Sequence, residues 1–205
     1  MAIWLIRHTA PDIPPGTCYG QSDIGLLDSF LEEAAAIREN LPEFPGRVYS
    51  SPLSRCRRLA EFLFPSQEIS WEPDLMEIHC GQWELRNWNE IPAEEIDPWM
   101  KNFVDKPIPG GESYVALHQR VTKAFLRIGA SESSAAIVTH GGVIRSILSH
   151  LTETGLTDSF NRFRIHYGCI IRVEHPAHSA NYEILFNPEP TSREWHKPAS
   201  FYGRS

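Results

Sequence analysis

Cysteine is scarce in this 205-residue chain, and its four cysteines are widely spaced. No Cys-x-x-Cys pair is present, so the sequence lacks a zinc-finger type of ligand pattern. The hydrophobic content, 41%, is also too high for a small domain held together by disulfides. We therefore expect four free thiols, no bound metal and a cytoplasmic location.

Long apolar runs are also missing. No run approaches the roughly 20 residues that span a bilayer, and the apolar start over residues 1–7 is shorter than a signal peptide and has no basic leader. These absences predict that the protein does not associate with membranes.

Basic residues are outnumbered, with 19 Lys and Arg against 26 Asp and Glu and a formal net charge of −7. A surface of this charge repels polyanions, so we do not expect a nucleic acid partner. An anionic small molecule would need a local group of arginines. The sequence does not indicate an oligomeric state.

Strand and helix patterns alternate along the chain, without internal repeats, and 41% of the residues are hydrophobic. The pattern predicts an α/β sandwich in one domain over residues 1–205, with an irregular tail from about 187. We expect strands near 3–6, 48–49, 135–139, 169–174 and 182–186, the last two as a hairpin, and helices near 26–41, 52–63, 94–104, 113–128 and 143–151. Ser51 is expected to cap the second helix with Pro52 in its first turn, and Gly141 and Gly142 to form a turn. The pattern over residues 68–89 does not separate into individual strands and helices.

Three of these strands end in groups that suit a phosphate: Arg7 and His8, Ser51 with Arg55 one turn later, and His140. The carboxyl ends of parallel strands share one edge of a sheet, where ligands bind. Arginine forks match phosphate oxygens, and a neutral imidazole can attack phosphorus. A histidine that follows a strand is more often structural when it stands alone. The five groups named above, taken together, favour a catalytic role.

A leaving alkoxide also needs a proton from a nearby carboxylic acid. Glu77 is a candidate because polar groups interrupt an apolar segment there, and Glu84 is a competing acid for which we favour a structural role.

The chain resembles the histidine phosphatase superfamily, which includes the cofactor-dependent phosphoglycerate mutases. Five segments carry the resemblance, in the family order: 5–9 (LIRHT), 50–55 (SSPLSR), 77–84 (Glu77 with GQWE), 109–113 (PGGES) and 138–142 (VTHGG). The resemblance implies a three-layer α/β/α sandwich with a mixed, mostly parallel sheet, and no metal or cofactor. It implies that His8 is the phosphorylated nucleophile, Glu77 the proton donor, and Arg7, Arg55 and His140 the phosphate pocket. Thr9 and Gly141, inside the same segments, are further candidates for binding the substrate.

Within the superfamily, residues 7–12 and 15–23 are similar to the α-ribazole phosphatase branch of cobalamin synthesis, where the mutases carry Gly in place of Thr9. The expected partner is therefore a small phosphate ester, with α-ribazole 5′-phosphate as the first choice. A broad-specificity phosphatase, a phosphoglycerate mutase and an inactive phosphate-binding homologue are the alternatives. Leu85 stands where the superfamily often has Gly, which bears on the substrate and not on the phosphate chemistry.

Overall fold

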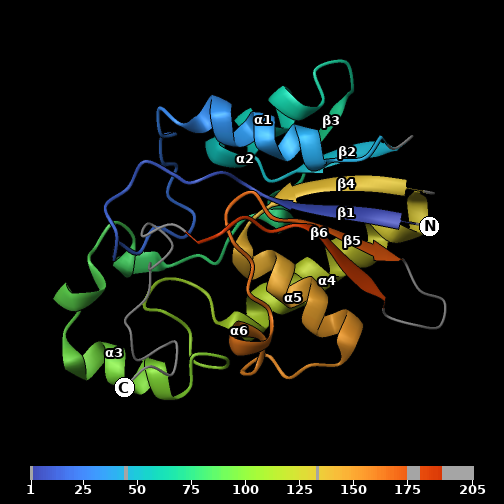
Figure 1. The fold of residues 1–205 in the computed structure, drawn as a ribbon. Helices are drawn as coiled ribbons and strands as arrows, with labels where there is room; N and C mark the ends of the chain where they lie inside the picture. Colours follow the sequence, from blue (N-terminus) through green and yellow to red (C-terminus); the bar gives the residue numbers. More distant parts are fainter. Residues whose placement is uncertain (1, 44–45, 133, 175–180, 191–205) are drawn as a thin grey trace.

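Six strands form one sheet in the computed structural model, which describes residues 2–43, 46–132, 134–174 and 181–190 (Figure 1). The spatial order is β3-β2-β4-β1-β5-β6. The first four strands in that order are parallel, and β5 runs antiparallel to both β1 and β6. The strands are β1 Ala2–Arg7, β2 Arg47–Ser50, β3 Ile69–Trp71, β4 Ser134–Thr139, β5 Ile170–Glu174 and β6 Tyr182–Phe186.

Helices cover both faces of this sheet, with α1 and α2 on one side and α4 and α5 on the other (Figure 1). Their bounds are α1 Phe30–Asn40, α2 Ser54–Leu63, α3 Ala93–Lys101, α4 Tyr114–Ser131, α5 Gly141–Thr152 and α6 Ser159–Arg162. Three short 3₁₀ turns, Pro73–Leu75, Gly81–Trp83 and Trp88–Glu90, precede α3. The predicted three-layer sandwich with a mixed, mostly parallel sheet is confirmed.

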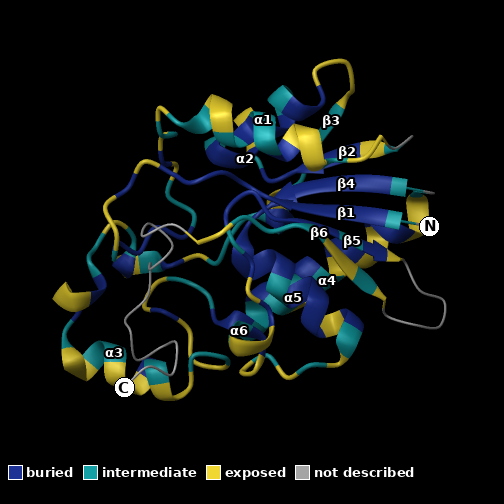
Figure 2. Cartoon of the chain, viewed as in Figure 1, coloured by how far each residue is buried: buried dark blue, intermediate teal, exposed yellow. Residues whose placement is uncertain are grey.

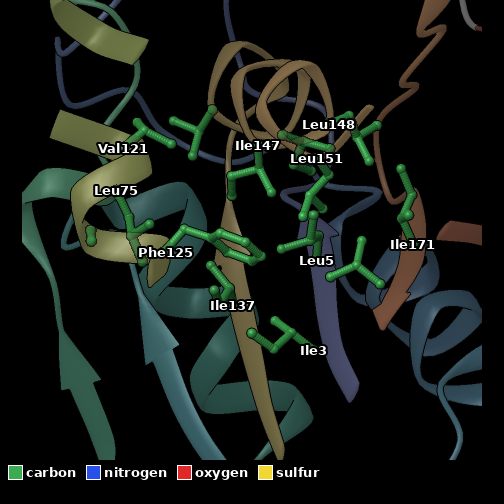
Figure 3. Close-up of a cluster of buried hydrophobic side chains, with 14 of the residues drawn as sticks. Ile3, Leu5, Leu75, Val121, Phe125, Ile137, Ile147, Leu148, Leu151 and Ile171 are labelled. Carbon is green, nitrogen blue, oxygen red and sulfur yellow. The ribbon is translucent and has the colours of Figure 1, made fainter. Parts of the chain in front are cut away.

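The central strands are buried on both faces because their side chains alternate between two cores (Figure 2). Ile3 and Leu5 of β1 point toward α4 and α5, in the core that Figure 3 shows, whereas Trp4 and Ile6 belong to the core under α1 and α2. This explains why β1 and β4 are continuous apolar runs that end abruptly in polar residues.

Two predicted helix starts are wrong. The first helix begins at Phe30 and not near Leu26, after a turn in which the Phe30 amide donates to the Leu27 carbonyl. The second begins at Ser54, so Ser51 and Pro52 lie outside it. The N-cap of that helix is Leu53, and the Ser51 hydroxyl accepts from the Leu53 amide at 3.4 Å and lies 2.8 Å from the His140 Nε2.

The predicted glycine turn after His140 is also wrong, since Gly141 and Gly142 are the first residues of α5 and His140 is its N-cap. The hairpin of β5 and β6 is confirmed, as are the four free thiols. Of the predicted irregular tail, residues 187–190 have neither helix nor strand, and residues 191–205 lie outside the described part of the chain.

Candidate active site

His8 and His140 follow the two central strands and meet at one edge of the sheet. Arg7 and Thr139 are register partners at the ends of β1 and β4, and the His8 amide donates to the Thr139 carbonyl at 3.0 Å. The two imidazole rings lie 5.1 Å apart between centroids, at an interplanar angle of 64°. The sheet topology therefore brings together two histidines that are separated by 132 residues, from 8 to 140.

The His8 ring is held in one tautomer by its own neighbour. Its Nδ1 lies 2.7 Å from the Thr9 carbonyl oxygen, which can only accept, so Nδ1 carries the proton. In the neutral imidazole the other ring nitrogen, Nε2, is then unprotonated and has the lone pair that a nucleophile needs.

His140 is buried, and its Nε2 lies 2.8 Å from the Ser51 hydroxyl. The Cys56 sulfur is 3.4 Å from the same nitrogen. Burial, followed by the positive charge of Arg55, holds the pKa of His140 well below its ordinary value. His140 is therefore neutral at pH 7 while no anion occupies the site.

Arg7 and Arg55 are both buried, and backbone carbonyls hold each of them. Arg7 donates through Nη1 to the Ile165 carbonyl at 2.5 Å. Arg55 donates to the carbonyls of Ser22 and Gly20 at 2.9 and 2.7 Å, and its Nε has no hydrogen-bond partner among the described residues. These contacts fix two guanidinium groups beside the histidines without neutralising their charge.

Glu77 lies against the first turn of α5. Its Oε2 accepts from the Gly142 amide at 3.0 Å and its Oε1 from the Ile78 amide at 2.9 Å. The competing acid, Glu84, accepts from the amides of Gln21 and Cys80 and from the Ser22 hydroxyl. Glu84 thus joins two loops, which agrees with the structural role that we favoured for it.

A cavity of about 640 Å³ opens beside these groups. Arg7, Glu77 and Gly141 line it, whereas His8, Arg55 and His140 are buried and do not line it. Six aromatic residues also line it, namely Tyr19, Trp88, Trp99, Phe103, Tyr114 and Phe160. The cavity therefore combines an aromatic part of its wall with charged side chains, which include Arg145, Arg164 and Glu189.

Two of the predicted substrate-binding residues have different surroundings. Thr9 is fully buried, does not line the cavity and serves His8 through its carbonyl, so its predicted contact with substrate stays a prediction. Gly141 does line the cavity, and a β-carbon there would lie 3.3 Å from the Arg7 Nε and 3.1 Å from an Arg145 nitrogen. Glycine allows the two guanidinium groups to approach the start of α5.

Sequence reasoning missed Ser51 as the partner of His140, and it missed Tyr19 and Tyr167. The buried hydroxyls of this tyrosine pair are 2.9 Å apart. Tyr19 lies in one of the loops that carried the resemblance, which is a usable signal. Tyr167 has no local signal, because its contact depends on residues 148 positions away.

Paired histidines and buried arginines at the carboxyl edge of a mixed sheet define an α/β protein of the phosphoglycerate mutase-like class. The chain belongs to the histidine phosphatase superfamily (branch 1), whose family model matches residues 3–187. Phosphatases of this superfamily act on small phosphorylated substrates.

Three comparisons illustrate the relationship. The chain is 26% identical over 178 residues to the adenosylcobalamin/alpha-ribazole phosphatase of Salmonella typhimurium, covering 82% of this chain and 88% of the relative. It is 34% identical over 163 residues to the metal-independent phosphoserine phosphatase of Arabidopsis thaliana, covering 74% and 68%. The crystal structure of the alpha-ribazole phosphatase from Shigella flexneri matches with a TM-score of 0.80, at 23% identity, over 90% of this chain and 95% of that one, which shows the shared fold.

None of the helices in the described ranges is both long and apolar enough to cross a membrane. No three or more His, Cys, Asp or Glu side chains within the same ranges are grouped so that they could hold a metal ion.

Proposed function

We propose that the protein hydrolyses a phosphate monoester through a phosphohistidine at His8. The observation that carries the proposal is the juxtaposition of His8, in the tautomer that leaves Nε2 unprotonated, with His140 and two buried arginines. Arg7 and Arg55 would bind the phosphoryl oxygens and stabilise the charge on them as the bond to the leaving group breaks.

The reaction would take two steps. His8 Nε2 attacks phosphorus and the ester P–O bond breaks, while a protonated Glu77 gives its proton to the departing oxygen. Water then attacks the phosphorus of the phosphohistidine, Glu77 takes a proton from that water, the P–N bond to His8 breaks and inorganic phosphate leaves. His140 would gain a proton only when a bound dianion offsets the burial and the two arginines that together hold its pKa low.

The trapping experiment is direct. Denaturing the enzyme with detergent at alkaline pH during turnover of a ³²P-labelled ester should leave a label on the protein that is stable in alkali and lost in acid, and His8→Ala should lose the label and lower kcat by at least about 10³-fold. His150→Ala is the control, because that side chain is exposed at the end of α5. A labelled His8→Ala protein with normal turnover would exclude this nucleophile.

For the substrate we propose α-ribazole 5′-phosphate. The aromatic wall of the 640 Å³ cavity suits a leaving group that carries a flat heterocycle, because aromatic rings stack on one another. The relative from Salmonella is named for this substrate. Its kcat/KM should exceed that of phosphoserine by at least about tenfold, the effect of roughly one aromatic contact. A flat profile would leave a broad-specificity phosphatase.

Phosphoserine is the second candidate. The Arabidopsis relative is named for it, and Arg145 and Arg164 also line the cavity, where a guanidinium could pair with a carboxylate. A preference for phosphoserine over α-ribazole 5′-phosphate in the same assay would favour this reading. The mutase alternative requires a bisphosphorylated primer, and turnover without one argues against it.

A further inference from the structure

Two buried tyrosines meet between the two arginines of the candidate site. Tyr19 comes from the loop after β1 and Tyr167 from the segment before β5, and their hydroxyl oxygens are 2.9 Å apart. Burial raises the pKa of Tyr19 although Arg7 and Arg55 lower it. The hydroxyl thus keeps its proton at neutral pH, and the hydrogen bond persists.

On one side, Tyr167 supports Arg7. The guanidinium carbon of Arg7 lies 3.9 Å from the centre of the Tyr167 ring, which is the geometry of a cation–π contact. The same guanidinium donates to the Ile165 carbonyl, two residues before Tyr167. The His8 ring also lies 5.4 Å from the Tyr167 ring. One short segment therefore positions Arg7 and contacts the candidate nucleophile.

On the other side, Arg55 holds the loop that carries Tyr19. Its two terminal nitrogens donate to the carbonyls of Gly20 and Ser22, and its guanidinium carbon is 5.2 Å from the centre of the Tyr19 ring. The hydrogen bond from Tyr19 to Tyr167 then joins this loop to the segment that positions Arg7.

We propose that the Tyr19–Tyr167 hydrogen bond is a clasp that sets the spacing of Arg7 and Arg55 and thereby the affinity of the site for phosphate. Both tyrosines are positioning residues that act through the arginines. The proposal rests on the proposed function, because it takes these two arginines as the phosphate ligands. It also links the pocket to the cavity wall, since Tyr19 lines that wall.

The test removes one hydroxyl at a time. Tyr19→Phe and Tyr167→Phe keep the rings, and each should weaken the binding of inorganic phosphate, measured by calorimetry, by about two- to tenfold, the effect of one hydrogen bond. The phosphate affinity of the double variant should lie within about twofold of that of the weaker-binding single variant, because both substitutions delete the same hydrogen bond. For an aryl phosphate, KM should rise more than kcat falls.

Tyr49→Phe is the matched control. Tyr49 is also buried, and its hydroxyl donates to Glu132 at 3.0 Å, outside the candidate site. The phosphate affinity of Tyr49→Phe should match that of the unmodified protein. Tyr167→Leu also removes the ring that contacts Arg7, so it should weaken phosphate binding more than Tyr167→Phe does.

Two results would overturn the clasp. One is unchanged phosphate affinity in both single variants, and the other is a double variant whose loss equals the product of the two single losses. Neither depends on turnover, so they stay separate from a failure of the proposed mechanism, which would appear as an active His8→Ala enzyme.

Discussion

Leu85 has a φ of 63°, in the left-handed region that costs a residue with a β-carbon roughly 1–2 kcal/mol. The side chain is 63% exposed, so removing it sacrifices little burial. Glycine relieves the strain but is more flexible in the unfolded chain by roughly 0.5–1 kcal/mol. Leu85→Gly should therefore raise the free energy of unfolding by about 0.5–1 kcal/mol, measured by urea denaturation.

Glu153 supplies the comparison, because its φ is 54° at the far end of α5. Glu153→Gly should give a similar gain in stability. If Leu85→Gly lowers stability while Glu153→Gly raises it, the Leu85 side chain makes a contribution that its exposure conceals.

Glu77 binds two backbone amides through its two carboxylate oxygens. A glutamine has one carbonyl oxygen and no acidic proton. Glu77→Gln should therefore slow the hydrolysis of esters with poor leaving groups most. We expect kcat to fall about 10²–10³-fold for an alkyl phosphate and less than about tenfold for p-nitrophenyl phosphate. Glu84→Gln, at the carboxylate with a structural role, should change kcat for both esters to the same extent. Equal losses with Glu77→Gln would contradict the proton-donor role.

At the scale of elements, the first turn of α5 packs directly on Glu77. A β-carbon on Gly142 would lie 2.2 Å from the Glu77 Oε1, so the carboxylate would have to move. A displacement of about 1 Å can cost on the order of 10²-fold in rate. Gly142→Ala should therefore lower kcat for an alkyl phosphate by at least about tenfold while circular dichroism stays unchanged.

Gly25→Ala is the matched control for that substitution, because nothing lies within 4 Å of a β-carbon at Gly25. It should retain the kinetics of the unmodified protein. Normal turnover in Gly142→Ala would mean that the position of the Glu77 carboxylate does not limit catalysis.

The elements that could be predicted are those whose signal is local. The strands β1 and β4 are continuous apolar runs because both of their faces are buried, and the polar residues that end them mark the site edge. The elements within residues 68–89 could not be predicted, because the conformation of this segment depends on tertiary contacts. Gly81, for example, has a φ of 48° and packs against the backbone of residues 109–111.

The same distinction applies within the candidate site. His8, Arg55 and His140 could be proposed because each follows a recognisable strand, and parallel strands share one edge. The role of Ser51 was misassigned because a serine before proline resembles a helix cap, whereas its hydroxyl faces an imidazole 89 positions away. The chemical roles of these residues stay predictions until the variants above are measured.

At the scale of the whole molecule, the buried His140 ties stability to pH. Its pKa is held low mainly by burial, whereas in the unfolded chain a histidine has a pKa of about 6.5. Below that pH the unfolded state binds a proton that the folded state does not, so the free energy of unfolding falls as pH falls. The slope from this group approaches about 1.4 kcal/mol per pH unit.

Urea denaturation between pH 5 and 7.5 measures this slope, and His140→Gln should make it shallower, whereas His79→Gln, at an exposed histidine, should not. His118, whose pKa burial also lowers, adds a smaller part in the same direction because it is only half-buried. Inorganic phosphate should flatten the slope of the unmodified protein, because a dianion between Arg7 and Arg55 favours the protonated form of His140. A slope that neither His140→Gln nor phosphate alters would show that the buried imidazole does not sense the anion, and His140 would then have no part in binding it.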